Sequence, residues 1–205
     1  MAQGDPAAPG ASALGPGRQP WADLGAQYQK PLAAMSAFVD ALEAEGVPAE
    51  RLCIAAFGPK MLALSRDRTA GAHPYLVIPE HTASAREQLG PGVLLAPGQA
   101  VAFETDPGRA REIARGALSV YLPMPNYIAS WKRQGFTDED IARVSDRLCD
   151  AMVAWGGVET IVSRVKAQID AGADHVCVKV VRGAPGGEAT DLLPQWRELA
   201  AALLA

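Results

Sequence analysis

Residues 158–181 read VETIVSRVKAQIDAGADHVCVKVV, and this stretch decides the fold class. Its apolar residues recur at helical spacing up to Ile169, which predicts a helix with one buried face. Gly172 is the residue type that ends a helix. The β-branched run from His175 to Val181 predicts a buried strand. A helix that leads directly into an apolar strand is half of a βαβ unit.

The same alternation extends upstream. Strands are predicted at residues 52–56, 73–78, 100–104 and 175–181, and helices at about 30–45, 59–69, 79–89, 106–121 and 158–171. Near-continuous apolar strands between helices imply crossover connections and a parallel sheet covered by helices. Pro123 and Pro125 interrupt the alternation, so residues 122–155 are predicted to be a helical insertion. A (β/α) barrel and an open doubly wound sheet both satisfy this pattern.

The two ends of the chain differ from its middle in composition. Residues 1–20 are rich in Ala, Gly and Pro and have too few large apolar side chains to offset chain entropy, which predicts a disordered leader. Residues 21–182 are expected to form the folded domain. Residues 183–205 begin with a Gly- and Pro-containing linker and end in a predicted helix from about Leu192.

Charge and cysteine content exclude several classes of protein. The chain has 19 basic and 23 acidic residues without a run of Lys or Arg, so neither nucleic acid nor an anionic membrane is an expected partner. Cys53, Cys149 and Cys177 are an odd number without CxxC spacing, which argues against a disulfide framework or a zinc site. No apolar run is long enough to span a membrane, and the N-terminus does not have the pattern of a signal peptide. We therefore expect a cytoplasmic protein whose partner is a small molecule.

The best candidate anion site lies at the junction between the first predicted strand and the helix that follows it. Ala56, Phe57, Gly58, Pro59 and Lys60 occupy this junction. Unpaired backbone N–H groups and the positive end of the helix dipole favour a phosphate at such a position. Neither GxGxxG nor GxxxxGK[ST] is present, so the junction is not a dinucleotide fingerprint or a P-loop. A tight turn between strand and helix is also the commoner, purely structural use of Gly-Pro.

Two histidines stand near the second predicted strand. His73 and Tyr75 lie at its start, and His81 lies in the helix start beyond it. A histidine at a strand end suits a general base or a cofactor contact, although capping and interior histidines are more common. No third ligand accompanies the pair, so no metal site is expected.

Two charged residues and three aromatic residues complete the candidates. Glu104 closes a predicted strand at its C-terminal end, where a barrel carries its active site, but a solvated loop acid fits equally well. Lys179 interrupts an apolar strand and points either into an enclosed barrel lumen, which we favour, or into water as an edge guard. Tyr127, Trp131 and Trp155 are interpreted as packing residues.

Four segments together resemble a known family. They are RLCIAAFGPKMLAL at 51–64, AGAHPYLVIPEHT at 70–82, ETDPGRAR at 104–111 and DAGADHVCV at 170–178. In this order they resemble the luciferase-like monooxygenase superfamily over about residues 24–181. The HPYLV segment followed by PEHT is similar to the branch that uses the deazaflavin coenzyme F420.

The resemblance implies a (β/α)8 barrel with its cofactor at the C-terminal ends of the strands. Residues 56–59 resemble the loop along the cofactor's ribityl-phosphate arm, and residues 73–75 resemble the next strand of the same mouth. The implied reaction is hydride transfer between the deazaflavin ring and a small organic substrate. The alternative within the family is an FMN-dependent monooxygenase.

The sequence departs from the family in length. A complete barrel takes about 250 residues, whereas only about four C-terminal βα units with a helical insertion are recognised here. We therefore expect a partial barrel without its N-terminal half, onto which no catalytic acid or base can be transferred. Its exposed strand edges and open lumen predict either a homo-oligomer or pairing with a missing barrel half. A non-catalytic half-barrel that serves as an assembly module is the alternative from another class.

Overall fold

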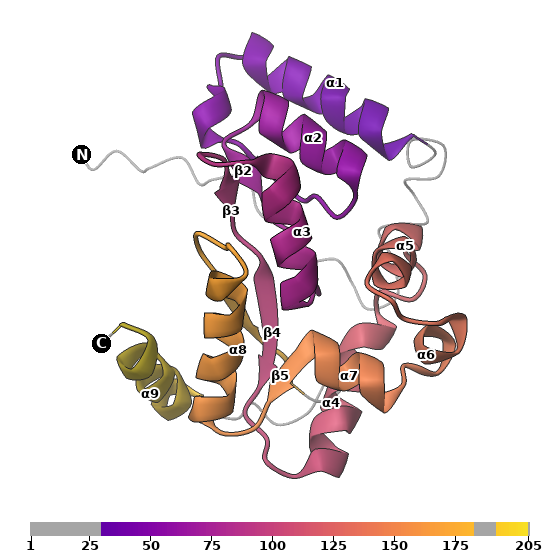
Figure 1. The fold of residues 1–205 in the computed structure, drawn as a ribbon, viewed down its shortest axis with the longest axis vertical. Helices are drawn as coiled ribbons and strands as arrows, with labels where there is room; N and C mark the ends of the chain where they lie inside the picture. The colour runs from indigo at the N-terminus through magenta and orange to yellow at the C-terminus, as the bar shows by residue number, and fades with distance from the viewer. Residues whose placement is uncertain (1–29, 183–191, 205) are drawn as a thin grey trace, which may run out of the picture.

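The computed structural model describes residues 30–182 and 192–204, so the predicted leader and the predicted linker lie outside the described residues. Figure 1 shows the arrangement of the elements. In chain order they are α1 (Pro31–Ala44), the 3-10 turn η2 (Ala49–Arg51), β1 (Cys53–Ile54), α2 (Pro59–Arg68), β2 (Gly71–Ala72), α3 (Pro79–Leu89), β3 (Leu94–Leu95), β4 (Gly98–Ala102), α4 (Pro107–Ser119), α5 (Pro125–Arg133), α6 (Asp138–Arg143), α7 (Asp146–Met152), β5 (Val153–Trp155), α8 (Val158–Asp170), β6 (Cys177–Val180) and α9 (Leu193–Leu204).

Local sequence explains where the helices begin. Helices α1 to α5 each start at a proline, which has no N–H group to leave unpaired and a backbone angle already suited to a helix. The carboxylate of Asp106 caps α4 by accepting from the Arg109 N–H at 2.8 Å. Thr137 and Asp140 form a capping box at the start of α6. The predicted helices are confirmed, with small differences at their ends.

All strand pairs in the described residues are parallel, as predicted. One sheet has the order β1-β2-β3 and the other the order β5-β4-β6. The expectation of one continuous curved sheet is wrong at the level of hydrogen bonding. Pro97 separates β3 from β4 and has no N–H group to donate, so the ladder is interrupted there. A single parallel bridge from Tyr75 to Gly98 links the two halves.

Two of the predicted strands are misplaced. The strand expected at residues 73–78 is found at Gly71–Ala72, because Pro74 cannot donate to a ladder and Leu76 adopts a positive φ of 55°. Gly71 is required there, since a Cβ atom on it would lie 2.3 Å from the Leu94 carbonyl oxygen. The strand expected at 100–104 spans Gly98–Ala102.

The sequence also leaves two strands unpredicted. Strand β3 is only two residues long, too short to show a period. Strand β5 follows α7 without a break, inside residues 122–155, which were predicted to be a helical insertion. A short apolar run of this kind cannot be told from a buried helical segment by periodicity.

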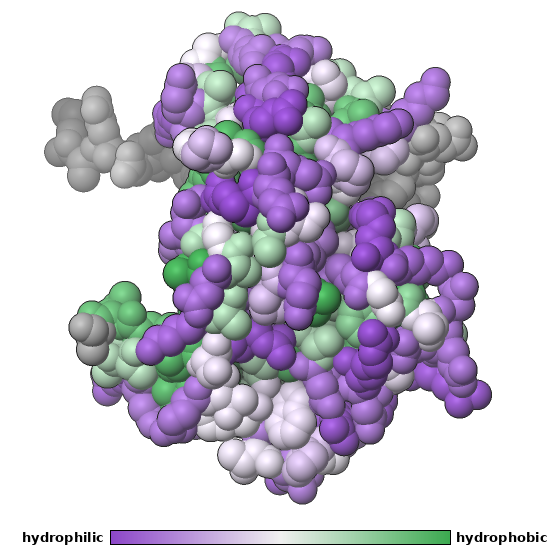
Figure 2. Space-filling model, in the orientation of Figure 1, coloured by the Kyte–Doolittle hydropathy of each residue, from purple (hydrophilic) through white to green (hydrophobic). Residues whose placement is uncertain are grey.

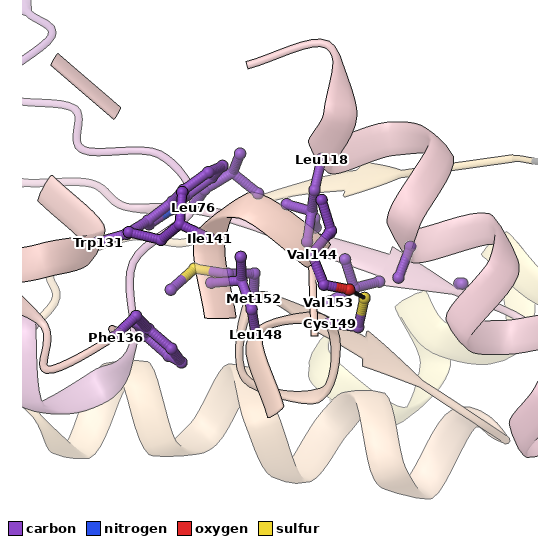
Figure 3. Packing of buried hydrophobic residues seen from close by; sticks show 13 residues of the cluster. Leu76, Leu118, Trp131, Phe136, Ile141, Val144, Leu148, Cys149, Met152 and Val153 are labelled. Atoms are coloured by element: carbon purple, nitrogen blue, oxygen red, sulfur yellow. Dashed lines mark hydrogen bonds between the residues drawn. The ribbon is translucent and has the colours of Figure 1, made fainter. Parts of the chain in front are cut away.

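The helical insertion covers one face of β4. Ala100 and Ala102 pack into the largest buried cluster, which is built mainly from α4 to α7 around Trp131 (Figure 3). Val101 points the other way, into a cluster with α8 and α9, because strand side chains alternate. Part of the sheet face that we expected to await another barrel half is therefore covered by the chain's own helices (Figure 1).

Buried polar side chains tie β4 to two helices. Gln99 and Gln168 are almost fully buried, and the Gln168 side-chain N–H donates to the Gln99 Oε1 at 3.1 Å. Gln168 also donates to the Val77 carbonyl at 3.0 Å and accepts from the Thr82 hydroxyl at 2.6 Å. These bonds hold α8, α3 and the loop before α3 in register with β4.

The outer surface is mainly hydrophilic in the view of Figure 2, with hydrophobic residues gathered over α9. Leu193, Trp196 and Leu204 are the exposed large apolar residues of that helix. In the described ranges, no helix is both long and apolar enough to cross a membrane.

Candidate functional site

Two cavities lie on either side of Phe57, the residue that follows β1 and precedes α2. The first, of about 360 Å³, is here named the arginine cavity; its lining residues are Phe57, Pro59, Ile78, Glu80, His81, Ser84, Gln88, Arg133, Gln134 and Gly135. The second, of about 310 Å³, is here named the tyrosine cavity; its lining residues are Ala55, Phe57, His73, Tyr75, Gly98, Tyr121, Tyr127, Cys177, Val178 and Lys179.

The predicted anion-binding loop joins β1 to α2. Ala56 is fully buried and anchors the loop, whereas Pro59 and Lys60 are exposed. Gly58 is the residue before α2, and no side chain caps the helix there. Pro59 has no N–H group, and the Met61 N–H donates to the Gly58 carbonyl at 3.0 Å. In the described residues this leaves the Lys60 N–H for a ligand at the positive end of the helix.

Arg133, at the end of α5, brings a positive charge to this loop. A Cβ atom on Gly58 would lie 3.3 Å from the Arg133 Nη2. No ion pair of Arg133 with a carboxylate is found among the described residues. The cavity also contains Glu80, an exposed residue in the first turn of α3. The guanidinium thus stands beside an uncapped helix N-terminus without a neutralising partner.

His81 contributes a neutral acceptor to the arginine cavity. Its Nε2 lies 2.9 Å from the Phe57 carbonyl oxygen. A carbonyl oxygen only accepts, so Nε2 carries the proton and Nδ1 carries a lone pair. Burial lowers the pKa of His81, and the nearby Arg133 charge lowers it further. The Nδ1 atom is buried without a hydrogen-bond partner in the described part of the chain, which leaves it available to a ligand donor.

Aromatic rings form a continuous wall in the tyrosine cavity. The centroids of Phe57 and Tyr127 are 4.9 Å apart, those of Tyr127 and Tyr121 are 4.5 Å apart, and those of Tyr121 and Tyr75 are 5.9 Å apart. Burial, and then the neighbouring Tyr121, raise the pKa of the Tyr75 phenol, so it stays protonated. Phe57 contacts this wall and also lines the arginine cavity.

Polar groups of the tyrosine cavity come from β6 and from the end of β2. The Nδ1 of His73 lies 2.6 Å from the Ala96 carbonyl oxygen, so this nitrogen donates and Nε2 is the acceptor of the ring. The Lys179 Nζ lies 4.9 Å from the centre of the Tyr75 ring and 3.5 Å from the Tyr121 hydroxyl. Gly98 gives Tyr75 its space, because a Cβ atom on Gly98 would lie 2.6 Å from that ring.

The expected enclosure of Lys179 is wrong for the described residues. Its side chain faces Tyr75, as an inward orientation requires, but it is exposed because β6 pairs only with β4 and leaves its other edge open. Lys179 thus combines the two alternatives considered from the sequence. It stands on an edge strand, and its side chain points toward Tyr75 and Tyr121.

Glu104 is not part of either cavity. The strand that it was expected to close ends at Ala102. Its carboxylate pairs with Arg109 at 3.1 Å and accepts from the Asp106 N–H at 3.0 Å, which stabilises the start of α4. It lines a separate hollow of about 710 Å³ at the C-terminal ends of β4 and β6.

Sequence reasoning missed the contribution of the insertion. Arg133, Tyr121 and Tyr127 reach the two cavities from α5 and from the segment before it. Nothing in their spacing relates them to residues 56–60. Trp131 is fully buried, as the packing interpretation requires, whereas Tyr127 also lines a cavity. Over the described residues, no group of three His, Cys, Asp or Glu side chains is placed to hold a metal ion.

Parallel strands covered by helices, with cavities at the strand ends, are the features of a partial (β/α) barrel. Two solved structures share this fold. One is the coenzyme F420-dependent tetrahydromethanopterin reductase from Methanopyrus kandleri, with a TM-score of 0.51 and 17% identity over 68% of this chain and 46% of that chain. The other is an F420-dependent secondary alcohol dehydrogenase in complex with an F420-acetone adduct, with a TM-score of 0.53 and 14% identity over 74% of this chain and 48% of that chain.

These comparisons concern the fold, and they favour the barrel over the doubly wound sheet. The chain spans about half the length of the solved structures that it matches. No family model matches the sequence, and no curated protein matches it.

Proposed function

We propose that the chain is an F420-dependent oxidoreductase of the luciferase-like monooxygenase family, which transfers hydride to or from a small organic substrate. The observation that carries this proposal is the position of Phe57 between two unlike cavities, one with an unpaired guanidinium and one walled by aromatic rings. F420 has the matching two parts, a planar deazaflavin ring and an anionic ribityl-phosphate arm.

The arginine cavity suits the arm. The Lys60 N–H in the first turn of α2 and the Arg133 guanidinium supply donors and positive charge at one point, and Gly58 allows a ligand to approach the backbone. Lys60 adds a second, exposed cation. His81 Nδ1 is a buried acceptor without a partner, which fits a hydroxyl of the arm or a protonated phosphate oxygen.

The tyrosine cavity suits the ring. When bound, the deazaflavin accepts or donates the hydride. The rings of Tyr75, Tyr121 and Tyr127 would orient a flat group and exclude water from its faces. His73 Nε2 can accept a hydrogen bond from a ring N–H. We assign no catalytic acid or base to this chain.

The open strand edges support an assembly proposal. In the described residues, β1 pairs only with β2, and β6 only with β4. Parallel strands from a second copy or from a separate barrel half would close both edges and bury Lys179. If the chain assembles but binds no cofactor, the half-barrel module without catalysis is the better assignment.

We place the protein in the cytoplasm, without nucleic acid or membrane partners.

The direct experiment is a titration of F420 into the purified chain, followed by fluorescence of the deazaflavin, with FMN titrated in parallel. The proposal expects saturable F420 binding and weaker FMN binding. Preferential FMN binding favours the monooxygenase alternative. Absence of binding by both cofactors contradicts the enzyme proposal for this chain.

A further inference from the structure

The hollow of about 710 Å³ at the C-terminal ends of β4 and β6 has no role in the proposed cofactor site. Ala102, Ile113 and Val181 give it apolar walls, and charged residues of α4 and of the segment after β6 also line it. Its volume lies well inside the range of small-molecule sites. The hollow is therefore large enough for a ligand of its own.

Three of the five charged residues that line this hollow already have partners. Glu104 and Arg109 pair with each other at 3.1 Å. Arg115 forms an ion pair with Asp146, which belongs to α7 and lies outside the lining. These three side chains neutralise one another or a neighbour, so they leave no net charge for a ligand.

One residue of each sign remains without a partner in the described part of the chain. Glu112 lies on α4 and Arg182 follows β6, and both are exposed at the hollow. Neither side chain forms an ion pair among the described residues, with the other or with a third group. A ligand that carries both a carboxylate and an ammonium group would give each of them a partner.

The hollow adjoins the tyrosine cavity along β6 and at the end of α4. Lys179 lines the tyrosine cavity, and Val181 lines the hollow. These two side chains point to the same side of the strand because strand side chains alternate, and two residues of strand span about 7 Å. Ser119 and Tyr121 have the same relation, with Ser119 in the hollow and Tyr121 in the tyrosine cavity.

We infer that the hollow binds an apolar amino acid or a similar small zwitterion. Arg182 is the counter-ion of its carboxylate, and Glu112 is the counter-ion of its ammonium group. Ala102, Ile113 and Val181 contact its apolar side chain. The assignment of this ligand as the substrate rests on the proposed function, which places the cofactor's ring in the adjoining cavity. Binding of the zwitterion itself does not depend on the cofactor.

Three probes with one apolar body test the need for both charges. L-Leucine carries a carboxylate and an ammonium group, 4-methylpentanoate has only the carboxylate, and 3-methylbutylamine has only the ammonium group. Isothermal titration of the full chain at low ionic strength measures the three affinities. We expect leucine to bind about fivefold more tightly than either single-charge probe, because each exposed ion pair contributes up to about 1 kcal/mol.

Variants assign each preference to one side chain. In Arg182→Met, leucine and 3-methylbutylamine should bind equally, whereas Arg182→Lys should keep most of the difference. In Glu112→Gln, leucine and 4-methylpentanoate should bind equally. Arg143→Met and Glu139→Gln are the matched controls, because these residues form an exposed pair on α6 outside the hollow. Circular dichroism of each variant shows whether folding is intact.

The position of the ligand has a separate test. Because the hollow and the cofactor's cavities have different linings, the chain saturated with F420 should still bind leucine. Competition between leucine and F420 would place leucine in a cofactor cavity and overturn the inference. No binding of leucine, equal binding of the three probes, or unchanged preferences in Arg182→Met and Glu112→Gln would overturn it as well.

The failures of the two proposals are distinguishable. A chain that binds F420 but shows none of the leucine preferences refutes the zwitterion site alone. A chain that binds no F420 refutes the oxidoreductase proposal, and the leucine preferences of the Arg182 and Glu112 variants then still decide the zwitterion site.

Discussion

The guanidinium of Arg133 lies beside Gly58, although the two residues are far apart in the sequence. A Cβ atom on Gly58 would be 3.3 Å from the Nη2 atom of Arg133. The glycine immediately precedes α2, and the arginine is the last residue of α5. A helix of the insertion thereby places its charge at the N-terminus of a helix in the barrel part. The insertion is thus a component of the candidate site as well as a cover for the sheet.

Removal of the guanidinium should weaken the binding of the cofactor's arm. We expect Arg133→Met to lower the affinity for F420 by about tenfold or more, because it deletes a charge-assisted contact with an anion. Fluorescence titration measures the change. Arg143→Met is the matched control, since Arg143 is exposed on α6 and pairs only with Glu139 there. Equal affinities of Arg133→Met and the control would remove Arg133 from the site.

A larger side chain at Gly58 should act on the same contact from the other side. Gly58→Val is expected to weaken F420 binding, because its branched side chain would crowd the start of α2 and displace Arg133. The backbone of Gly58 has a φ of −116°, which valine also adopts, so stability should change little. Gly116→Val serves as the control, because a Cβ atom on Gly116 meets nothing within 4 Å. Unchanged binding by Gly58→Val would contradict the arm site.

His81 should make folding stability sensitive to acid. Burial lowers the pKa of His81 below its ordinary value of 6.5, so the unfolded chain takes up a proton more readily than the folded chain. Stability from this residue is therefore complete above pH 6.5 and decreases as the pH falls below it. Urea unfolding between neutral pH and pH 5 measures this slope. The slope should be smaller in His81→Gln; an equal slope in both proteins would show that His81 contributes nothing to it.

The buried glutamine pair should be important for stability. Gln168→Met keeps the size of the side chain but leaves the Thr82 hydroxyl, the Val77 carbonyl and Gln99 without their shared partner. We expect a loss of about 1–3 kcal/mol in the free energy of unfolding. Gln88→Met, on the exposed face of α3, should stay within about 0.5 kcal/mol of wild type. Denaturant titrations of the three proteins decide the matter, and a stable Gln168→Met would show that the bonds contribute little.

Open strand edges should lead to association. Because β1 and β6 each have an unpaired edge in the described residues, we expect sedimentation velocity at micromolar concentration to detect a dimer or a larger species. Addition of a separately expressed N-terminal barrel half should shift this equilibrium. A compact monomer that binds little apolar dye would contradict the assembly proposal and would show that the insertion and α9 protect the sheet sufficiently.

The sequence predicts helices better than strands in this protein. The prolines that start α1 to α5 and the capping box of Thr137 and Asp140 are local signals, and the structure contains all of them. Strands β3 and β5 have only two and three residues, so their existence depends on pairing partners that lie far away in the sequence. Periodicity cannot report such a partner.

The candidate site also contains residues that local sequence can indicate and residues that it cannot. The loop at residues 56–60 is a local pattern, so the sequence suggested it as a candidate, together with His73 and Tyr75. Arg133 and Tyr121 belong to the site only because the chain brings the segment around α5 to the loop after β1, which no spacing encodes. Lys179 was noticed because it interrupts an apolar strand, although its exposure follows from the open edge of β6.

The central position of β4 has a consequence for synthesis on the ribosome. Both strands that flank β4 in its sheet are made much later, since Ala100 pairs with Val153 on one side and with Lys179 on the other. The sheet of β1, β2 and β3 can form while the chain is still growing, but β4 must wait for β5 to cover one of its edges and for β6, made later still, to cover the other. During that interval β4 is the segment most exposed to wrong pairing, so a chaperone that binds extended apolar segments should engage the nascent chain there.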